Sequence, residues 1–200
     1  AGGSAEETVG DTAPATTESA AVCQWVCGDV RDADSYAGHL EGVDTVVHLA
    51  ALTGKQRPKD HFAVNAEGTR ILLQQCRRAG VRRFLHASTI AVKFPDITHY
   101  PYAQSKAKAE EAVRTSGLSY TIIRPTIVLG SDSPSWKAFR TLAAGPLTVV
   151  FGDGKTLIQP IHVDDLVTCI YCIIQDDEFD NSILDLGGPQ TTSMERFLRD

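Results

Sequence analysis

The sequence predicts an α/β fold with a doubly wound parallel sheet. Short β-branched or apolar runs alternate with helical runs from Val22 to about Gly130. Successive strands are joined by whole helices, which is typical of parallel strands covered by helices on both faces. Polar and small residues follow the ends of several of these strands, where open sheets of this kind bind ligands. We therefore expect one cleft at the carboxyl edge of the sheet.

The composition describes one ordinary globular domain. The chain has 200 residues, a formal charge of -6, 42% hydrophobic residues and 22% charged residues. It shows no basic stripe of the kind that nucleic-acid binding needs, so a nucleic-acid partner is not expected. No apolar run approaches membrane-spanning length and no signal pattern opens the chain, so we expect no membrane partner and a cytoplasmic location.

The N-terminal part divides at Val22. Residues 1–21 are rich in Ala, Gly, Thr, Ser and Glu, and we expect a disordered or tag-like segment there, with one domain over 22–200. Val22 to Val26 is predicted as a strand that enters the turn Gly28-Asp29-Val30. A helix is expected from Asp32 to Leu40. The β-branched run from Asp44 to Ala50 predicts a strand covered on both faces.

The middle of the chain repeats this alternation. A long helix is expected from Lys59 to Ala79, ended by Gly80, and a strand from Val81 to Ala87. A loop from Ser88 to Pro101 precedes the helical run from Gln104 to Ser116. The remaining predicted elements are a strand at Ser119 to Arg124, a helix at Ser135 to Ala144, a strand at Leu147 to Phe151, a turn at Gly152-Asp153-Gly154, a buried helix at Val163 to Gln175, a strand at Ser182 to Leu186 and a helix from Met194 to Asp200.

The five cysteines are odd in number and scattered, so no disulfide framework is predicted. Cys169 and Cys172 have the spacing of a redox or metal pair, but they lie in an apolar run without a second pair. Buried structural thiols explain them better, and no metal site is predicted.

The stretch Tyr102-Ala103-Gln104-Ser105-Lys106 carries the clearest chemistry. Residues four apart share one face of a helix, so the Tyr102 hydroxyl and the Lys106 ammonium can converge on one site. An ammonium beside a phenol favours the phenolate, so we expect the pKa of Tyr102 to be lowered towards the working range. This pair suits proton transfer to or from an alcohol, although the same spacing also occurs on ordinary amphipathic helices.

Several other polar residues have two interpretations. Ser88 and Thr89 follow a predicted strand and are either a catalytic hydroxyl pair or a helix or turn cap. Asn65 is either a site residue or an ordinary helix N-cap. Asp164 and Asp165 are expected to stabilise a helix start. Two histidines, His48 and His162, are expected to be core or rim residues rather than ligands.

Seven spaced motifs together resemble the short-chain dehydrogenase/reductase superfamily, in particular its NAD-dependent epimerase/dehydratase branch and the atypical relatives of that branch. In chain order they are Gly28-Asp29-Val30, Val47-His48-Leu49-Ala50-Ala51, Asn65-Ala66-Glu67-Gly68-Thr69, Ala87-Ser88-Thr89, Tyr102 to Lys106, Arg124-Pro125-Thr126-Ile127-Val128-Leu129-Gly130 and Ile161-His162-Val163-Asp164-Asp165. The resemblance implies a Rossmann-like domain that binds NAD or NADP.

The resemblance also implies a role for each motif. Tyr102, Lys106 and a hydroxyl from Thr89 or, ranked second, Ser88 would form the catalytic set, and Asn65 would help to place Lys106 through water. Tyr102 would exchange a proton with a hydroxyl-bearing small molecule, such as a nucleotide sugar, while hydride passes to or from the nicotinamide. The cofactor-binding residues would be Asp29, Val30, Leu49, Ala50, Ala51, Tyr102, Lys106, Pro125 and Thr126.

The sequence departs from the family pattern at its N-terminal side. None of its 16 glycines forms the Gly-x-x-Gly-x-x-Gly turn that binds the cofactor pyrophosphate, and the first predicted strand resembles the third strand of the family. A unit of roughly 50 residues is therefore expected to be missing. A catalytically silent nucleotide-binding or interaction protein, or a fragment without function of its own, is accordingly the alternative to an enzyme.

Loss of the central strands would leave an edge on the Asp44 to Ala50 strand, which is open to pairing with another chain. Three arrangements would cover such an edge: a homo-oligomer that completes the sheet, a strand exchanged between chains, or a rearranged sheet. The loop between Thr89 and Tyr102 carries Val92-Lys93-Phe94 where the family has Val-Tyr-Gly. This loop resembles the atypical branch, some of whose members bind NAD(P) without known turnover.

Overall fold

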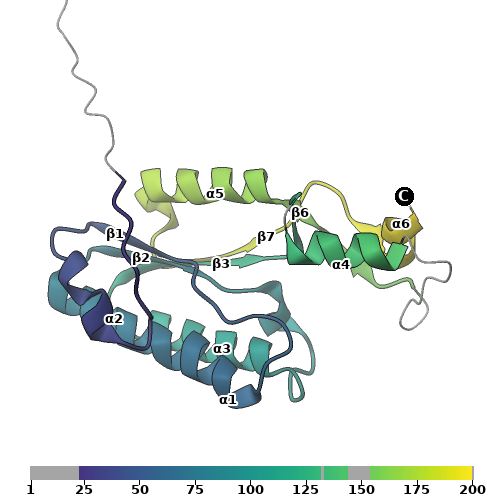
Figure 1. The fold of residues 1–200 in the computed structure, drawn as a ribbon. Helices are drawn as coiled ribbons and strands as arrows, with labels where there is room; N and C mark the ends of the chain where they lie inside the picture. Colours follow the sequence, from purple (N-terminus) through teal and green to yellow (C-terminus); the bar gives the residue numbers. More distant parts are fainter. Residues whose placement is uncertain (1–22, 132, 144–153, 200) are drawn as a thin grey trace, which may run out of the picture.

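The computed structural model describes residues 23–131, 133–143 and 154–199. Its centre is a parallel sheet of four strands in the order β1 (Thr45–His48), β2 (Arg83–Ala87), β3 (Ser119–Pro125) and β7 (Ser182–Leu186). Helices α2 (Thr69–Ala79) and α3 (Pro101–Arg114) lie on one side of the sheet, and α5 (Val163–Gln175) lies on the other (Figure 1). The predicted α/β architecture is confirmed.

Smaller elements follow the carboxyl end of β3. The strands β4 (Val128–Leu129) and β6 (Ile161–His162) pair in parallel, and β5 (Leu157–Ile158) and β8 (Thr192–Ser193) pair antiparallel. Helices α4 (Pro134–Ala143) and α6 (Met194–Arg199) lie beside one another there (Figure 1), with the rings of Phe139 and Phe197 5.2 Å apart. The strand expected at Leu147 to Phe151 lies outside the described residues, as does most of the turn expected after it.

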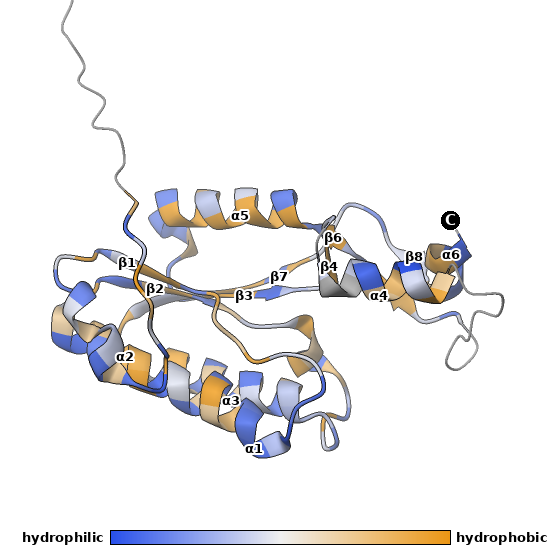
Figure 2. Ribbon diagram, viewed as in Figure 1, coloured by the Kyte–Doolittle hydropathy of each residue, from blue (hydrophilic) through white to orange (hydrophobic). Residues whose placement is uncertain are grey.

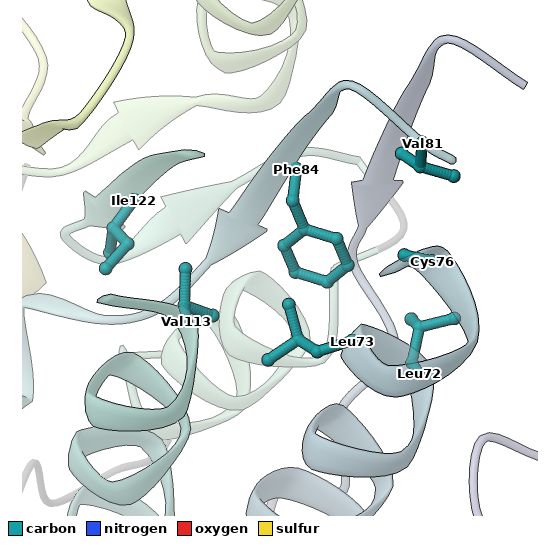
Figure 3. Close-up of a cluster of buried hydrophobic side chains, with 7 residues drawn as sticks. All are labelled: Leu72, Leu73, Cys76, Val81, Phe84, Val113 and Ile122. Carbon is teal, nitrogen blue, oxygen red and sulfur yellow. The ribbon is translucent and has the colours of Figure 1, made fainter. Parts of the chain in front are cut away.

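Two apolar clusters fix the helices on the sheet. On one face, Phe84 of β2 points towards Leu73 of α2 (Figure 3), and the cluster also contains Leu72, Cys76, Val81, Val113 and Ile122. On the other face, Leu85 and Ile123 pack against Ile173 of α5. Alternate strand residues therefore serve opposite cores, as the continuous apolar strands of a sheet with two covered faces require.

The helix expected from Lys59 to Ala79 is divided into three segments. A short α1 (Pro58–His61) leads into a π-helical segment (Phe62–Gly68), and α2 then continues to Ala79. Gly80 ends the helix with a φ of 74°, which confirms the predicted stop. Gly68 has a packing role, because a Cβ built there would lie 2.7 Å from Cγ2 of Val30. The turn that carries Val30 thus rests on the π-helical segment.

Two expectations for the N-terminal part are wrong. The described part of the expected first strand, Cys23–Val26, is not a strand, and Trp25 is 92% exposed. A strand needs a neighbour for its backbone hydrogen bonds, and no described strand pairs with it. The segment Asp32 to Leu40 forms two 3₁₀ turns, Ala33–Ser35 and Ala37–His39, because the Ser35 hydroxyl bonds back to the carbonyl of Asp32 at 2.6 Å in place of a continuous helix.

Helix α5 is only partly buried, contrary to the prediction. It carries hydrophobic and hydrophilic residues along its length (Figure 2), and Tyr171 is 63% exposed. Cys172 is exposed and Cys169 half-buried, so the expectation of two buried thiols is wrong. The reason is that the described neighbours cover only the side of the helix that faces the sheet. None of the helices in the described ranges is long and apolar enough to cross a bilayer.

Candidate active site

Helix α3 presents three polar side chains along one face. Tyr102, Lys106 and Glu110 stand at successive four-residue intervals, so they lie one above another on the helix. Lys106 is 1% exposed and Glu110 2% exposed. A buried ammonium and a buried carboxylate are unusual and require partners, so this face of α3 is a functional-site candidate in its own right.

The Tyr102 side chain interacts with the Thr89 hydroxyl, as the family pattern implies. Burial raises the pKa of Tyr102, and the neighbouring Tyr100 phenol acts in the same direction, while the nearby Thr89 side chain partly offsets both. The expected lowering of the Tyr102 pKa is therefore wrong for the chain by itself. Burial dominates because it disfavours the phenolate more than the neighbouring groups favour it.

Lys106 is almost fully buried. Burial lowers the pKa of its ammonium from 10.5 to about 8, and the charge of Glu110 acts in the opposite direction. Two histidines approach it from the sheet, His48 of β1 and His86 of β2, with their rings 5.3 Å apart. Burial lowers the pKa of His48 to about 4 and that of His86 well below its usual value, so both imidazoles are neutral near pH 7.

His48 is a satisfied core histidine, as predicted. Its Nε2 lies 2.9 Å from the Thr69 hydroxyl, which itself donates to the carbonyl of Asn65 at 2.6 Å. His48 must then donate from Nε2, because the Thr69 hydrogen is already committed. His162 is exposed instead, and its side chain caps α5 by accepting from the amide of Asp164, which confirms a structural role at this helix start.

Glu110 joins the helix to the ends of two strands, and the sequence reasoning did not single it out. Its Oε1 accepts a hydrogen bond from the Ser88 hydroxyl at 2.5 Å and one from Nε of Arg124 at 2.9 Å. Its Oε2 accepts from Nη2 of Arg124 at 2.6 Å. A signal was present, since an acid four residues after Lys106 falls on the same helix face.

The charge network continues to the last strand of the sheet. Nη1 of Arg124 lies 3.8 Å from a carboxylate oxygen of Asp185, and the other oxygen of Asp185 lies 2.6 Å from the Lys93 ammonium. Arg124 and Asp185 are register partners on β3 and β7. The carboxyl ends of β2, β3 and β7 are therefore connected through charged side chains on the α3 side.

Asn65 lies inside the π-helical segment, so its interpretation as a helix N-cap is wrong. Its amide nitrogen donates to the carbonyl of Leu52 and to the hydroxyl of Ser105, both at 3.0 Å, and its amide oxygen accepts from the Leu52 amide at 2.7 Å. Asn65 thus ties the segment after β1 to α3, one residue before Lys106. Thr89, by contrast, does cap the 3₁₀ turn Ile90–Lys93 through the amide of Ala91, in addition to contacting Tyr102.

Of the residues expected to bind the adenosine side of a cofactor, some are exposed to solvent and Asp29 already pairs with another side chain. Asp29 pairs with Arg31 through both carboxylate oxygens, and this hydrogen bonding lowers the pKa of Asp29 to about 2. Leu49 and Ala50 are exposed, whereas Ala51 is half-buried. Leu49 is exposed directly after the buried His48, so the end of β1 presents an apolar surface that a ligand can cover.

The residues expected beside the nicotinamide lie at the end of β3. Pro125 is buried as the last residue of the strand, and Thr126 is half-buried. The amide of Thr126 donates to the carbonyl of Leu186 at 2.9 Å, and its hydroxyl donates to the carbonyl of Gln159. Thr126 is therefore anchored to two other segments.

The donor set fits one half of a dinucleotide. A phenol, a hydroxyl and a buried ammonium provide the groups that orient a nicotinamide ribose and a substrate oxygen. The pyrophosphate half has no such set, because the 200 residues contain no Gly-x-x-Gly-x-x-Gly turn. Among the described residues, no group of three or more His, Cys, Asp or Glu side chains is placed to hold a metal ion.

A doubly wound parallel sheet with a hydroxyl, Tyr and Lys at the carboxyl ends of its strands defines the short-chain dehydrogenase/reductase class. Within that class, the chain belongs to the NAD dependent epimerase/dehydratase family, whose family model matches residues 6–187.

Known proteins support this assignment. The chain is 30% identical to the dTDP-glucose 4,6-dehydratase DesIV from Streptomyces venezuelae, solved with NAD and TYD bound, with a TM-score of 0.74 over 86% of this chain and 60% of that one. It is 31% identical over 163 residues to an N-acetyl-α-D-glucosaminyl-diphospho-ditrans,octacis-undecaprenol 4-epimerase from Escherichia coli O157:H7, covering 72% of this chain and 49% of that protein. It is 27% identical over 186 residues to a 3β-hydroxysteroid dehydrogenase/Δ5→4-isomerase from Mycobacterium tuberculosis, covering 78% of this chain and 50% of that protein. The chain thus spans about half the length of these two curated relatives.

Proposed function

We propose that this chain carries the Ser/Thr-Tyr-Lys site of an NAD(P)-dependent oxidoreductase or epimerase/dehydratase that acts on a hydroxyl-bearing small molecule, with a nucleotide sugar as the first candidate. The observation that carries the proposal is the position of Tyr102 one helical turn before the buried Lys106 on α3, with the Thr89 side chain near the phenol. Nucleotide-sugar and lipid-linked sugar enzymes among the relatives support the substrate class.

Each residue has a role in this proposal. Thr89 holds the substrate oxygen, and Tyr102 gives or takes its proton. Lys106 binds the nicotinamide ribose and, as an ammonium, stabilises the phenolate form of Tyr102 when the site is occupied. A bound nicotinamide supplies hydride transfer at the substrate carbon. Asn65 positions this part of α3 through its bond to Ser105.

The first test is cofactor binding, measured by calorimetry and thermal shift with NAD and NADP. A ligand at a hundred times its dissociation constant should stabilise the folded chain by about 2.7 kcal/mol. If millimolar NAD and millimolar NADP both leave the melting temperature unchanged, this chain does not bind either cofactor.

The second test is the variant Tyr102→Phe in assays with dTDP- and UDP-sugars. Loss of the phenol should lower turnover by roughly 10²- to 10⁴-fold while cofactor affinity changes little, since the ring remains. The matched control is Tyr100→Phe, which removes the hydroxyl of a neighbouring tyrosine whose ring centre lies 5.9 Å from that of Tyr102. Undiminished turnover in Tyr102→Phe would remove this residue from the mechanism.

A second candidate function is a nucleotide-binding or interaction protein of the same fold without turnover. The raised pKa of Tyr102 favours it, because a phenolate base is then harder to form near neutral pH. Cofactor binding without turnover on any sugar nucleotide, together with wild-type affinity in Tyr102→Phe, is the result that this function predicts.

We also propose self-association through the edge strand β1. In the described residues β1 pairs only with β2, and Leu49 at its end is exposed. An unpaired edge beside exposed apolar residues is a template for a strand of a second chain. Light scattering after size exclusion should show a dimer that a Val46→Pro substitution converts to monomer, whereas a monomer at all concentrations rejects the proposal.

A further inference from the structure

The buried network around Glu110 has features that the proposed catalytic set does not use. Glu110 lies on α3, yet its carboxylate is bonded to the end of β2 through Ser88 and to the end of β3 through Arg124. A carboxylate with 2% exposure is expensive to bury unless such bonds compensate it. Lys106 lies four residues earlier on α3, so these two buried side chains share one face of the helix, one turn apart.

We propose that Glu110 is a positioning residue of this site: held by Ser88 and Arg124, it keeps the buried Lys106 side chain in its charged form. The role of this charge in turnover rests on the proposed function, whereas the charge itself can be measured without any reaction.

The surroundings of Lys106 explain why a countercharge matters. His48 faces Lys106 from β1 and His86 faces it from β2; burial lowers the pKa of both imidazoles, so both are neutral near pH 7 and neither supplies a countercharge. Tyr102, on the same helix, is neutral near pH 7 because its pKa is raised. In the described part of the chain, the acid that favours the charged form of Lys106 is therefore Glu110.

The network also distinguishes the roles of the two candidate hydroxyls, those of Ser88 and Thr89. Ser88 donates its hydrogen to Glu110 at 2.5 Å and is buried, whereas Thr89 contacts Tyr102. A hydroxyl whose hydrogen is committed to a carboxylate cannot donate that hydrogen to a substrate oxygen as well. Ser88 therefore belongs with Glu110 as part of the positioning network, and Thr89 is the hydroxyl available for substrate.

The test is an NMR titration of the chain labelled with ¹³C at lysine Cε, with the Lys106 signal assigned by its loss in Lys106→Met. In Glu110→Gln, the pKa of Lys106 should fall by roughly one unit because an adjacent opposite charge is removed. The matched control is Glu111→Gln, which removes the same charge from the next, exposed residue of α3 and should leave Lys106 unchanged. An unchanged or raised Lys106 pKa in folded Glu110→Gln overturns the proposal.

A second variant decides the question if Glu110→Gln does not fold. Glu110→Asp keeps the charge but withdraws it by one methylene, so the Lys106 pKa should fall by less than in the amide variant yet measurably. No change in Glu110→Asp overturns the proposal. If the chain turns over a substrate, the alkaline limb of its pH profile should shift with the Lys106 pKa, and a titration shift without any turnover would uphold the positioning role while rejecting the proposed function.

Discussion

Replacing Lys106 with Met should stabilise the protein at neutral pH. Burial lowers the pKa of Lys106 from 10.5 to about 8, a change of roughly 2.5 units, and each unit corresponds to about 1.4 kcal/mol. The folded chain therefore carries a cost of about 3 kcal/mol below pH 8 for holding this ammonium away from water. Met has a similar length and no charge, so Lys106→Met removes that cost.

The pH dependence gives the sign of the effect. Between pH 8 and 10.5 the unfolded chain binds the lysine proton and the folded chain does not, so wild-type stability rises with pH across this window. The gain in Lys106→Met should accordingly be about 3 kcal/mol at pH 7 and below about 1 kcal/mol at pH 10. If Lys106 is catalytic, the stabilised variant should also be inactive, as expected where a site holds a strained charge.

Urea unfolding at pH 7 and pH 10 measures this difference. The matched control is Lys108→Met, because Lys108 lies on the same helix and is exposed, with its ammonium 5.2 Å from the centre of the Phe62 ring. That control should stay within about 0.5 kcal/mol of wild type at both pH values. A gain in Lys106→Met that is absent, or equal at the two pH values, would refute the assignment of a buried ammonium.

Two further predictions concern the frame of the site. Burial lowers the pKa of His48 from 6.5 to about 4, so between these pH values the unfolded chain binds a proton that the folded chain does not. The free energy of unfolding of the wild type should therefore fall by about 3 kcal/mol from pH 7 to pH 4 because of this residue. His48→Gln should not show this loss, and urea unfolding at the two pH values measures the difference. Gly68→Ala should displace Val30, destabilise the fold by about 1–3 kcal/mol and speed amide hydrogen exchange around Val30. The control is Gly38→Ala, where a new Cβ meets nothing within 4 Å and no such effect is expected. Equal exchange rates in the two variants would contradict the packing role of Gly68.

The sequence predicted the sheet well because its strands are short apolar runs and its helices end at clear signals. β1, β2, β3 and β7 all fall within predicted strands or extend them by one residue, and Gly80 ends α2 with the expected positive φ. The prediction failed at Cys23–Val26, because an apolar run becomes a strand only where another strand accepts its hydrogen bonds.

The candidate site was predictable only in part. The spacing of Tyr102 and Lys106, and the hydroxyl of Thr89, were visible as a motif, and the structure brings Thr89 and Tyr102 together. The direction of the Tyr102 pKa shift could not be predicted from the sequence, because desolvation depends on which groups cover the ring in the fold rather than on its neighbours in sequence. Glu110 was missed because its partners are distant in sequence: Ser88 directly follows β2, and Arg124 lies near the end of β3.

The π-helical segment Phe62–Gly68 means that the site depends on the number of residues as well as on their identity. A π turn accommodates one residue more than an α turn, and each α-helical residue rotates the chain by roughly 100°. Removing a single residue between Phe62 and Asn65 would let the segment relax to α geometry, and the α1 side would then turn relative to Asn65 and Gly68. Relatives whose aligned segment is shorter by one residue would have to connect the segment after β1 to α3 by another route.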